Sequence, residues 1–272
     1  MNTTNIRTKD FTWSTDLNIA INRSKVLELY GDESLDYFIQ DYESRMGYKI
    51  EVGKPLGQYY GLLYDGVYTT DDFNQQADGT YRIKDGVASL KGLDRKKIKP
   101  GDAKYVPTAG ETDSNGNPVW STNDRTVIGN AAPNFTGGWN NTFTYKGFDL
   151  TLDFQFTWGV DVMQEYYHST VARFLTNGID RLYKEAWHPT LNPSGKEQAI
   201  RLNNFGQGAN NQADDDWVCN GSYLRCNMIQ LGYTFNPTLI KKIGLSSLRL
   251  YANVNNAFLI TSKDYNGYDL SL

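Results

Sequence analysis

The sequence predicts an all-β fold in which long antiparallel strands form part of a transmembrane β-barrel with long extracellular loops. Three observations support this prediction. Several long stretches alternate between apolar and polar side chains, the pattern of strands with one face in an apolar medium. Aromatic residues make up 14% of the 272 residues, yet the mean hydropathy is only -0.56. Long polar segments separate the alternating stretches. Membrane barrels combine these features because only one face of each strand meets lipid.

Alternation is most regular in residues 11–21 and residues 148–158. In the first stretch one face carries Phe11, Trp13, Leu17, Ile19 and Ile21. In the second stretch the apolar face carries Phe148, Leu150, Leu152, Phe154, Phe156 and Trp158. A period of two residues excludes a helix, so both stretches are expected to be strands.

A third alternating stretch, residues 135–145, is joined to the 148–158 strand by Lys146 and Gly147 alone. A two-residue connection that ends in glycine predicts a tight antiparallel hairpin. At a tilt of about 40° the second strand would rise through about 25 Å, the height of the apolar band of an outer-membrane barrel. Four aromatic side chains are expected at the membrane interfaces, Tyr145 and Phe148 beside the turn, Trp158 at the other end, and Trp13.

Two further strands are expected at residues 223–235 and 247–260. In the second, Leu248, Leu250, Ala252 and Val254 alternate with polar neighbours, which predicts lipid on one side and an aqueous lumen on the other. The segment between the two strands is short enough for a single helical turn. The pattern thus indicates an incomplete barrel made of two-faced strands.

Residues 70–130 and 159–222 are polar and rich in Asp, Asn, Gly and Pro, and they are expected to be long extracellular loops. In the second loop, four aromatic side chains are candidates for stacking on sugar rings: Tyr166, Tyr167, Tyr183 and Trp187. Packing within the loop explains them equally well. The acidic run Asp214-Asp215-Asp216 is expected to be a solvated stretch.

A calcium loop is the best metal candidate. Asp113, Asn115, Asn117, Ser121 and Asp124 occupy positions one, three, five, nine and twelve of such a loop. Pro118 stands where glycine is needed, and Asp124 replaces the bidentate glutamate. These departures favour a turn without metal, and no other cofactor is expected.

Other function classes find little support in the sequence. The net charge is -4 and no window is dominated by Lys and Arg, so nucleic acid is a poor candidate partner. No carboxylate pair stands out as an acid and base, and His168 and His188 have no ligand partners at metal spacing. Cys219 and Cys226 are expected to be free thiols, unless the chain folds back at Asn220-Gly221. The sequence therefore does not indicate an enzyme.

The ordered segments resemble the SusC/RagA family of TonB-dependent outer-membrane transporters. The phrases that carry this resemblance are VGKPLGQYYGLLYDGVY (52–68), DRTVIGNAAPNFTGGWNNTFTYKGFDLTLDFQF (124–156), NGSYLRCNMIQLGYTF (220–235) and IGLSSLRLYANVNNAFLIT (243–261). Their order and spacing are similar to those of the family across nearly the whole chain. In the 113–124 loop the family pattern is more acidic and richer in glycine, so the metal ligands are weakened here.

The resemblance implies a large barrel with an N-terminal plug, energised by TonB, that imports nutrients in the outer membrane. The implied substrates are oligosaccharides, with peptides as the alternative, and the implied partner is a SusD-like surface lipoprotein. Residues 1–272 are expected to be the C-terminal part of the barrel, without signal peptide, plug or closing strands. Such a fragment would expose strand edges that lipid cannot satisfy, so function is expected to belong to the longer parent protein.

The rival hypothesis is a soluble or surface-attached all-β module that binds glycans, with its apolar faces packed together as a sandwich. The length of the predicted strands and the aromatic residues at their ends suit a bilayer better than a sandwich. The barrel is therefore the leading prediction.

Overall fold

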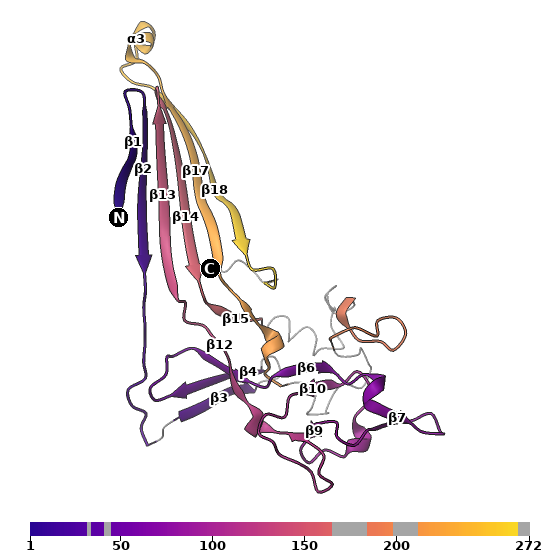
Figure 1. The fold of residues 1–272 in the computed structure, drawn as a ribbon. Helices are drawn as coiled ribbons and strands as arrows, with labels where there is room; N and C mark the ends of the chain where they lie inside the picture. Colours follow the sequence, from indigo (N-terminus) through magenta and orange to yellow (C-terminus); the bar gives the residue numbers. More distant parts are fainter. Residues whose placement is uncertain (32–33, 41–44, 165–183, 198–211, 266–272) are drawn as a thin grey trace. The chain divides into compact units, whose positions relative to one another are not determined.

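The computed structural model describes residues 1–31, 34–40, 45–164, 184–197 and 212–265. The chain forms two compact units, coloured by sequence in Figure 1. The sheet unit comprises Met1–Arg23, Ala132–Asp161 and Asn220–Leu272, and the loop unit comprises Ser24–Ala131 and Val162–Cys219. The fold is all-β with antiparallel sheets, as the sequence predicted.

The sheet unit is one antiparallel sheet of six strands in the order β1-β2-β13-β14-β17-β18. These strands are β1 (Asn2–Arg7), β2 (Phe11–Ala20), β13 (Phe135–Tyr145), β14 (Phe148–Trp158), β17 (Tyr223–Thr234) and β18 (Arg249–Thr261). The five long strands expected from alternation are all present, whereas the polar strand β1 was missed. The sheet is open, with β1 and β18 at its two edges, as expected for a segment of a barrel.

Short turns join β1 to β2, β13 to β14, and β17 to β18 (Figure 1). The last of these connections contains the helical turn α3 (Pro237–Ile240), which the sequence predicted, followed by the 3-10 turn η5 (Lys241–Ile243). Because the strands are antiparallel, all three short turns lie at one end of the sheet. The long connections from β2 to β13 and from β14 to β17 leave from the opposite end. This asymmetry is the one that outer-membrane barrels have.

Strand register lines up side chains of the same kind across the sheet. At the end with the short turns, Phe11 pairs with Tyr145, Tyr145 with Phe148, and Phe148 with Tyr233. The rings of Phe148 and Tyr233 are 4.5 Å apart between centroids. An aromatic row therefore crosses four strands of the sheet.

The opposite face of the sheet is polar in the same register. One row crosses five strands through Ser14, Thr142, Thr151, Gln230 and Asn253. A shift of one residue in any strand would move its apolar side chains to this polar face. The alternation in the sequence thus specifies both the pairing and the two faces.

Gly232 in β17 makes room for an ion pair on the polar face. The Arg249 guanidinium donates to Asp149 on β14 over distances of 2.5 and 3.3 Å, reaching across the intervening strand. A Cβ at position 232 would lie 2.6 Å from both carboxylate oxygens of Asp149. The absence of a side chain at this position lets residues on two non-adjacent strands meet.

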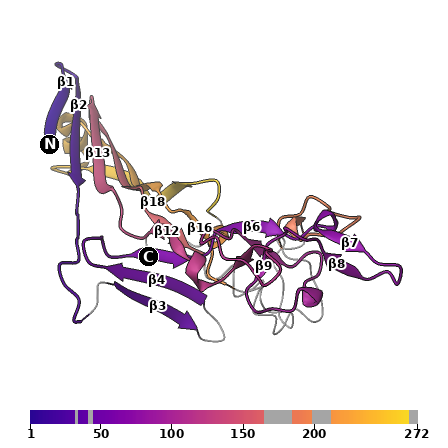
Figure 2. The same cartoon turned by 60° about the horizontal axis from the view of Figure 1, so that its bottom comes forward.

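The loop unit consists of short strands and 3-10 turns (Figure 2). Its largest sheet has the order β12-β5-β4-β3, with β3 (Ser34–Gln40), β4 (Arg45–Glu51), β5 (Gln58–Gly61) and β12 (Thr126–Asn130). Two-stranded pairs are formed by β6 (Tyr64–Val67) with β10 (Ala103–Tyr105), β7 (Phe73–Gln75) with β8 (Tyr81–Ile83), β9 (Ser89–Leu90) with β11 (Val119–Trp120), and β15 (Asp161–Met163) with β16 (Val218–Asn220). The 3-10 turns are η1 (Thr70–Asp72), η2 (Arg95–Lys97), η3 (Thr122–Asp124) and η4 (Asp215–Trp217).

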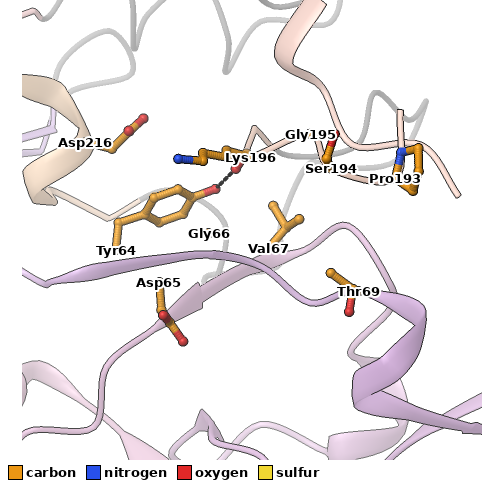
Figure 3. A pocket seen from close by; sticks show the side chains of 10 residues that line it. All are labelled: Tyr64, Asp65, Gly66, Val67, Thr69, Pro193, Ser194, Gly195, Lys196 and Asp216. Atoms are coloured by element: carbon orange, nitrogen blue, oxygen red, sulfur yellow. Dashed lines mark hydrogen bonds between the residues drawn. The ribbon is translucent and has the colours of Figure 1, made fainter. Parts of the chain in front are cut away.

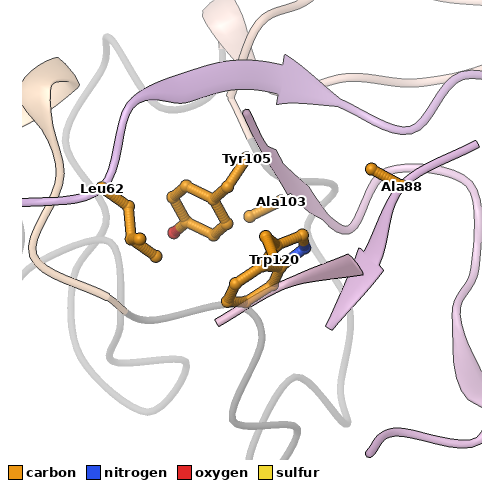
Figure 4. Close-up of a cluster of buried hydrophobic side chains, with 5 residues drawn as sticks. All are labelled: Leu62, Ala88, Ala103, Tyr105 and Trp120. Atoms are coloured by element: carbon orange, nitrogen blue, oxygen red, sulfur yellow. The ribbon is translucent and has the colours of Figure 1, made fainter. Parts of the chain in front are cut away.

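The loop unit has its own hydrophobic core, which the sequence did not predict. One buried cluster contains Leu62, Ala88, Ala103, Tyr105 and Trp120 (Figure 4). The rings of Tyr105 and Trp120 meet edge to face, 4.8 Å apart between centroids. A second cluster contains Tyr68, Phe73, Ile83 and Ile98. These side chains are spread thinly among polar residues, which conceals the core in the sequence.

None of the described helices is long and apolar enough to cross a membrane.

We predict that Gly137→Ala lowers the free energy of unfolding of the full-length protein by about 1–3 kcal/mol, the usual cost of overpacking. A Cβ at position 137 would lie 2.4 Å from the Asn18 carbonyl oxygen and 2.4 Å from the Phe156 ring, so the backbone of β2 would have to move. The measurement is the urea concentration at which the protein loses its heat-modifiable migration on gels.

The matched control is Gly138→Ala in the same strand. Its Cβ would approach the side-chain amide nitrogen of Asn18 at 3.1 Å, and a side chain can move aside. Equal losses of stability in the two variants would contradict the packing argument.

Candidate functional site

A cavity of about 480 Å³ lies in the loop unit beside strand β6 (Figure 3). Its size is within the usual range of small-molecule sites, about 300–1,000 Å³. The residues that line it are Tyr64, Asp65, Gly66, Val67, Thr69, Pro193, Ser194, Gly195, Lys196 and Asp216. Three segments that are far apart in the sequence therefore meet around one hollow.

The wall opposite β6 is the segment 184–197, which is held by its own hydrogen bonds. The Trp187 backbone N–H donates to the Glu197 carbonyl at 2.8 Å. The backbones of His188 and Asn192 exchange hydrogen bonds of 3.0 and 3.1 Å. The Asn192 side-chain amide donates to the Lys184 and Ala186 carbonyls at 2.9 and 3.0 Å. These bonds fix the turn Asn192-Pro193-Ser194-Gly195, whose composition is typical of tight turns.

Tyr64 ties β6 to this wall. Its hydroxyl donates to the Lys196 carbonyl at 2.7 Å (Figure 3). Its ring meets Tyr105 of the buried cluster edge to face, 5.8 Å apart between centroids. One side chain thus connects the cavity to the core of the loop unit. This contact could not be predicted from the sequence because 132 residues separate its two partners.

The acidic run Asp214-Asp215-Asp216 forms the third side of the site, and its three carboxylates have different partners. Asp214 is only 3% exposed and accepts a hydrogen bond from the Tyr105 hydroxyl at 3.0 Å. The Asp215 carboxylate accepts from the Tyr64 backbone N–H at 2.7 Å. Asp216 lines the cavity. The prediction of a solvated acidic run was therefore wrong for Asp214, because its partner Tyr105 lies far away in the sequence.

Burial raises the pKa of Asp214 well above its ordinary value, and the neighbouring charge of Asp216 raises it further. The same burial raises the pKa of Tyr105 well above its ordinary value, with Asp214 as the next cause. A protonated carboxyl is the form that this apolar environment favours. Burial therefore favours the uncharged forms of both groups, and Asp216 lines the cavity beside them.

Asp65 on the other side of the cavity has a cationic partner. The Lys104 amine lies 3.3 Å from an Asp65 carboxylate oxygen and 3.6 Å from Asp72. Lys196 supplies a second amine at the cavity itself, on the same side of Tyr64 as Asp216 (Figure 3). The cavity is thus bordered by charges of both signs.

The residues of the candidate calcium loop are used for internal hydrogen bonds. Asp113 accepts from the Asn115 and Asn117 backbone N–H groups at 2.8 and 2.9 Å, and these bonds lower its pKa together with one from the Asn117 side chain. Asp124 is buried and accepts from the Ala109 and Ser121 N–H groups at 2.6 and 2.7 Å. The two carboxylates therefore serve separate networks. Within the described residues no three His, Cys, Asp or Glu side chains are arranged to hold a metal ion.

Trp187 is the described member of the predicted sugar-stacking set, and its ring is 5% exposed and packs against Val67. The structure gives this ring no free face on which a sugar could stack. Tyr166, Tyr167 and Tyr183 lie outside the described residues, as does His168. His188 accepts the N–H groups of Thr190 and Leu191 at its Nδ1 atom, at 3.2 and 3.0 Å, and so helps to hold the turn.

The predicted membrane-interface residues lie on the apolar face of the sheet unit. Tyr145, Phe148 and Trp158 are 49%, 49% and 58% exposed. Trp13 stacks on Phe143 at 5.7 Å, and its indole N–H donates to the Asn141 side chain at 3.1 Å. The polar edge of Trp13 is therefore bound within the sheet. Cys219 and Cys226 are both buried thiols and form no disulfide, as expected.

Comparison with known proteins identifies the chain. TonB-dependent receptor P39 of Formosa agariphila is 30% identical over an alignment of 296 residues including gaps. The alignment covers 98% of this chain and 26% of that protein. TonB-dependent receptor SusC of Bacteroides thetaiotaomicron is 27% identical, with 97% of this chain and 22% of that protein covered. The chain belongs to the SusC/RagA family of TonB-dependent receptors, a non-enzymatic family of the outer membrane.

A solved structure of the RagAB peptide transporter shares the fold, with a TM-score of 0.66 and 20% sequence identity. The match covers 97% of this chain and 25% of that one. No protein-family model matches the chain. The SusC/RagA chain described here spans about a quarter of the length of its curated relatives.

We predict that Asp214→Asn stabilises the loop unit at neutral and alkaline pH. The raised pKa means that the folded protein holds a proton which the unfolded chain releases above its ordinary pKa of about 3.9. The free energy of opening therefore falls as pH rises from about 4 through the raised pKa. Asparagine keeps an oxygen for the Tyr105 hydroxyl and removes this dependence.

The measurement is hydrogen-exchange protection of residues 103–105 and 212–218 in the full-length protein, corrected for intrinsic exchange rates. A tenfold gain in protection at pH 8 would correspond to about one pKa unit. Asp85→Asn, an exposed carboxylate of the same unit, is the control and should change nothing. A gain at pH 4 as large as at pH 8 would refute the linkage.

Proposed function

We propose that this chain is part of a TonB-energised importer of nutrients across the outer membrane. The observation that carries the proposal is the two-faced sheet. Its apolar side chains remain exposed to an extent that a water-soluble core would not allow, with Leu231, Val254 and Ile260 at 52%, 57% and 56%. Contiguous exposed apolar surface of this kind marks contact with lipid or with a partner.

The apolar face would meet lipid and the polar face would line the aqueous lumen. Each β-hairpin turns through a short connection at one end, which corresponds to the periplasmic side of a barrel. The loop unit then corresponds to the long connections at the cell surface. The rival soluble sandwich needs the apolar face to be buried against a second sheet, and the exposed side chains of β17 and β18 argue against it.

The aromatic side chains at the strand ends are proposed to anchor the barrel at the interfaces. Tyr145 and Phe148 belong to the aromatic row at the end with the short turns, and Trp158 lies at the opposite end of β14. A ring with an apolar body and a polar tip suits the boundary between head groups and hydrocarbon. Trp13 would contribute ring surface only, because its N–H is bound to Asn141.

Partners and substrate follow from the family. We propose a SusD-like surface lipoprotein as the lid, TonB as the energy source acting through the N-terminal part of the parent protein, and oligosaccharides as the substrate. The support for the lipoprotein is the family membership together with the fold shared with the RagAB transporter. Peptide import remains an outcome of the uptake test below.

We predict that Leu152→Lys impairs assembly of the full-length barrel, whereas Thr151→Lys is tolerated. Leu152 lies near the middle of β14 on the apolar face, and Thr151 precedes it on the polar face. A lysine at the bilayer midplane costs about 2–4 kcal/mol on the lipid face of a barrel. The measurement is the fraction of protein in the outer membrane that shows heat-modifiable migration. Equal assembly of both variants would contradict the assignment of the faces.

We predict that deleting the gene for the parent protein abolishes uptake of at least one class of neutral oligosaccharide. Collapse of the proton-motive force in wild-type cells should abolish the same uptake, because TonB-coupled transport requires energy. The measurement is the accumulation of fluorescent oligosaccharides and, in parallel, of fluorescent peptides. Loss of peptide uptake alone would replace the proposed substrate, and unchanged uptake of both classes would refute the importer.

A further inference from the structure

We infer that the cavity beside β6 is a binding subsite for an uncharged sugar residue of the transported oligosaccharide. The inference rests on the proposed import function and adds a place and a chemistry to it. The cavity of about 480 Å³ is made by β6, by the turn at residues 193–196 and by Asp216, all within the loop unit (Figure 3).

The walls of the cavity are set before any ligand arrives. The turn is closed by the bonds between His188 and Asn192, and Tyr64 fixes it to β6 through the 2.7 Å bond to the Lys196 carbonyl. Behind the Tyr64 ring lies the buried Tyr105. A site that is already ordered loses little conformational entropy when it binds. The cavity is therefore suited to recognising a ligand of one shape.

The charges around the cavity favour a ligand without net charge. Lys104 lies within ion-pairing distance of Asp65, and the cavity holds one further amine and one further carboxylate, from Lys196 and Asp216. Asp214 behind them is buried and accepts a hydrogen bond from the Tyr105 hydroxyl, and burial raises its pKa. Charges of both signs border the cavity, so an anionic or a cationic group would meet repulsion as well as attraction.

The lining offers the mixture of groups that a sugar ring needs. The carboxylates of Asp65 and Asp216 accept hydrogen bonds from hydroxyl groups, and the Lys196 amine and the Ser194 and Thr69 hydroxyls donate them. The apolar side chains of Val67 and Pro193 and the Tyr64 ring cover the CH face of a ring. A few polar groups converging on a partly apolar hollow are the usual form of a small-molecule site.

The test uses the full-length transporter purified in detergent. Its probes are a panel of neutral hexasaccharides covering the common hexoses and pentoses, and a panel of hexapeptides, with affinities measured by calorimetry. Ser194→Trp should block the cavity, because Ser194 is exposed at its lip and its weak side-chain bond is to Asn192 at 3.5 Å. We expect the affinity for the bound hexasaccharide to fall at least tenfold, which is about 1.4 kcal/mol.

Leu191→Trp is the matched control, since Leu191 is 85% exposed on the same turn and does not line the cavity. It should leave the affinity within about twofold. Lys196→Gln should weaken neutral hexasaccharides only modestly, because glutamine still donates a hydrogen bond at that position.

Three outcomes would overturn the inference: no hexasaccharide binds the wild-type protein saturably, Ser194→Trp binds it as tightly as the wild type, or the variant loses only peptide binding. Each of these is distinguishable from failure of the import function, which is judged by uptake in the gene deletion. A deletion strain that loses uptake while Ser194→Trp binds normally would reject the subsite and leave the importer standing.

Discussion

The alternation of apolar and polar side chains, interrupted in β17 by a bulge between Cys226 and Met228, is the constraint on which the sheet unit depends. Inside a bilayer each backbone N–H and C=O group must be bonded to a neighbouring strand, and each side chain must suit its own medium. Register satisfies both demands together, since a shift of one residue exchanges the two faces. Two glycines show how closely the strands and their side chains pack. Gly232 leaves space for the Asp149–Arg249 pair, and Gly137 leaves space for the Phe156 ring.

The loop unit is stabilised in a different way, by a small core and by polar groups that are bonded inside it. Trp120 and Tyr105 provide most of the bulk of one buried cluster, and the Tyr105 hydroxyl reaches the buried Asp214. A buried carboxyl costs free energy unless it is bonded or protonated; here it accepts a bond from Tyr105, and burial raises its pKa. This arrangement connects the segment after residue 211 to the segment around residue 62, where Leu62 and Asp214 form a bridge. The cavity lies where these segments meet the turn at 193–196.

Features set by neighbouring residues were predictable from the sequence, whereas features set by distant pairs were not. Alternation over 148–158 and the Lys146-Gly147 turn predicted a hairpin whose register is now observed without a break. Strand β1 was not predicted because its residues are mostly polar and do not alternate. It forms a strand by pairing with β2. The cavity was not predicted because the residues that line it become neighbours only after folding, as Tyr64, Lys196 and Asp216 do. Trp187 was a candidate for stacking on sugar because it is an aromatic residue in a polar stretch. In the structure the same ring packs against Val67.

The position of the cavity in the loop unit fits what the proposed importer would require of its sites. A substrate must be held long enough to be selected and must still leave toward the lumen, so a series of weak sites serves better than a single tight one. The cavity is open and small, which limits the affinity that it would give to one sugar residue. On the proposed function, several such contacts along an oligosaccharide would add through effective concentration. Selectivity can therefore arise at the surface of the protein while each contact remains easily broken.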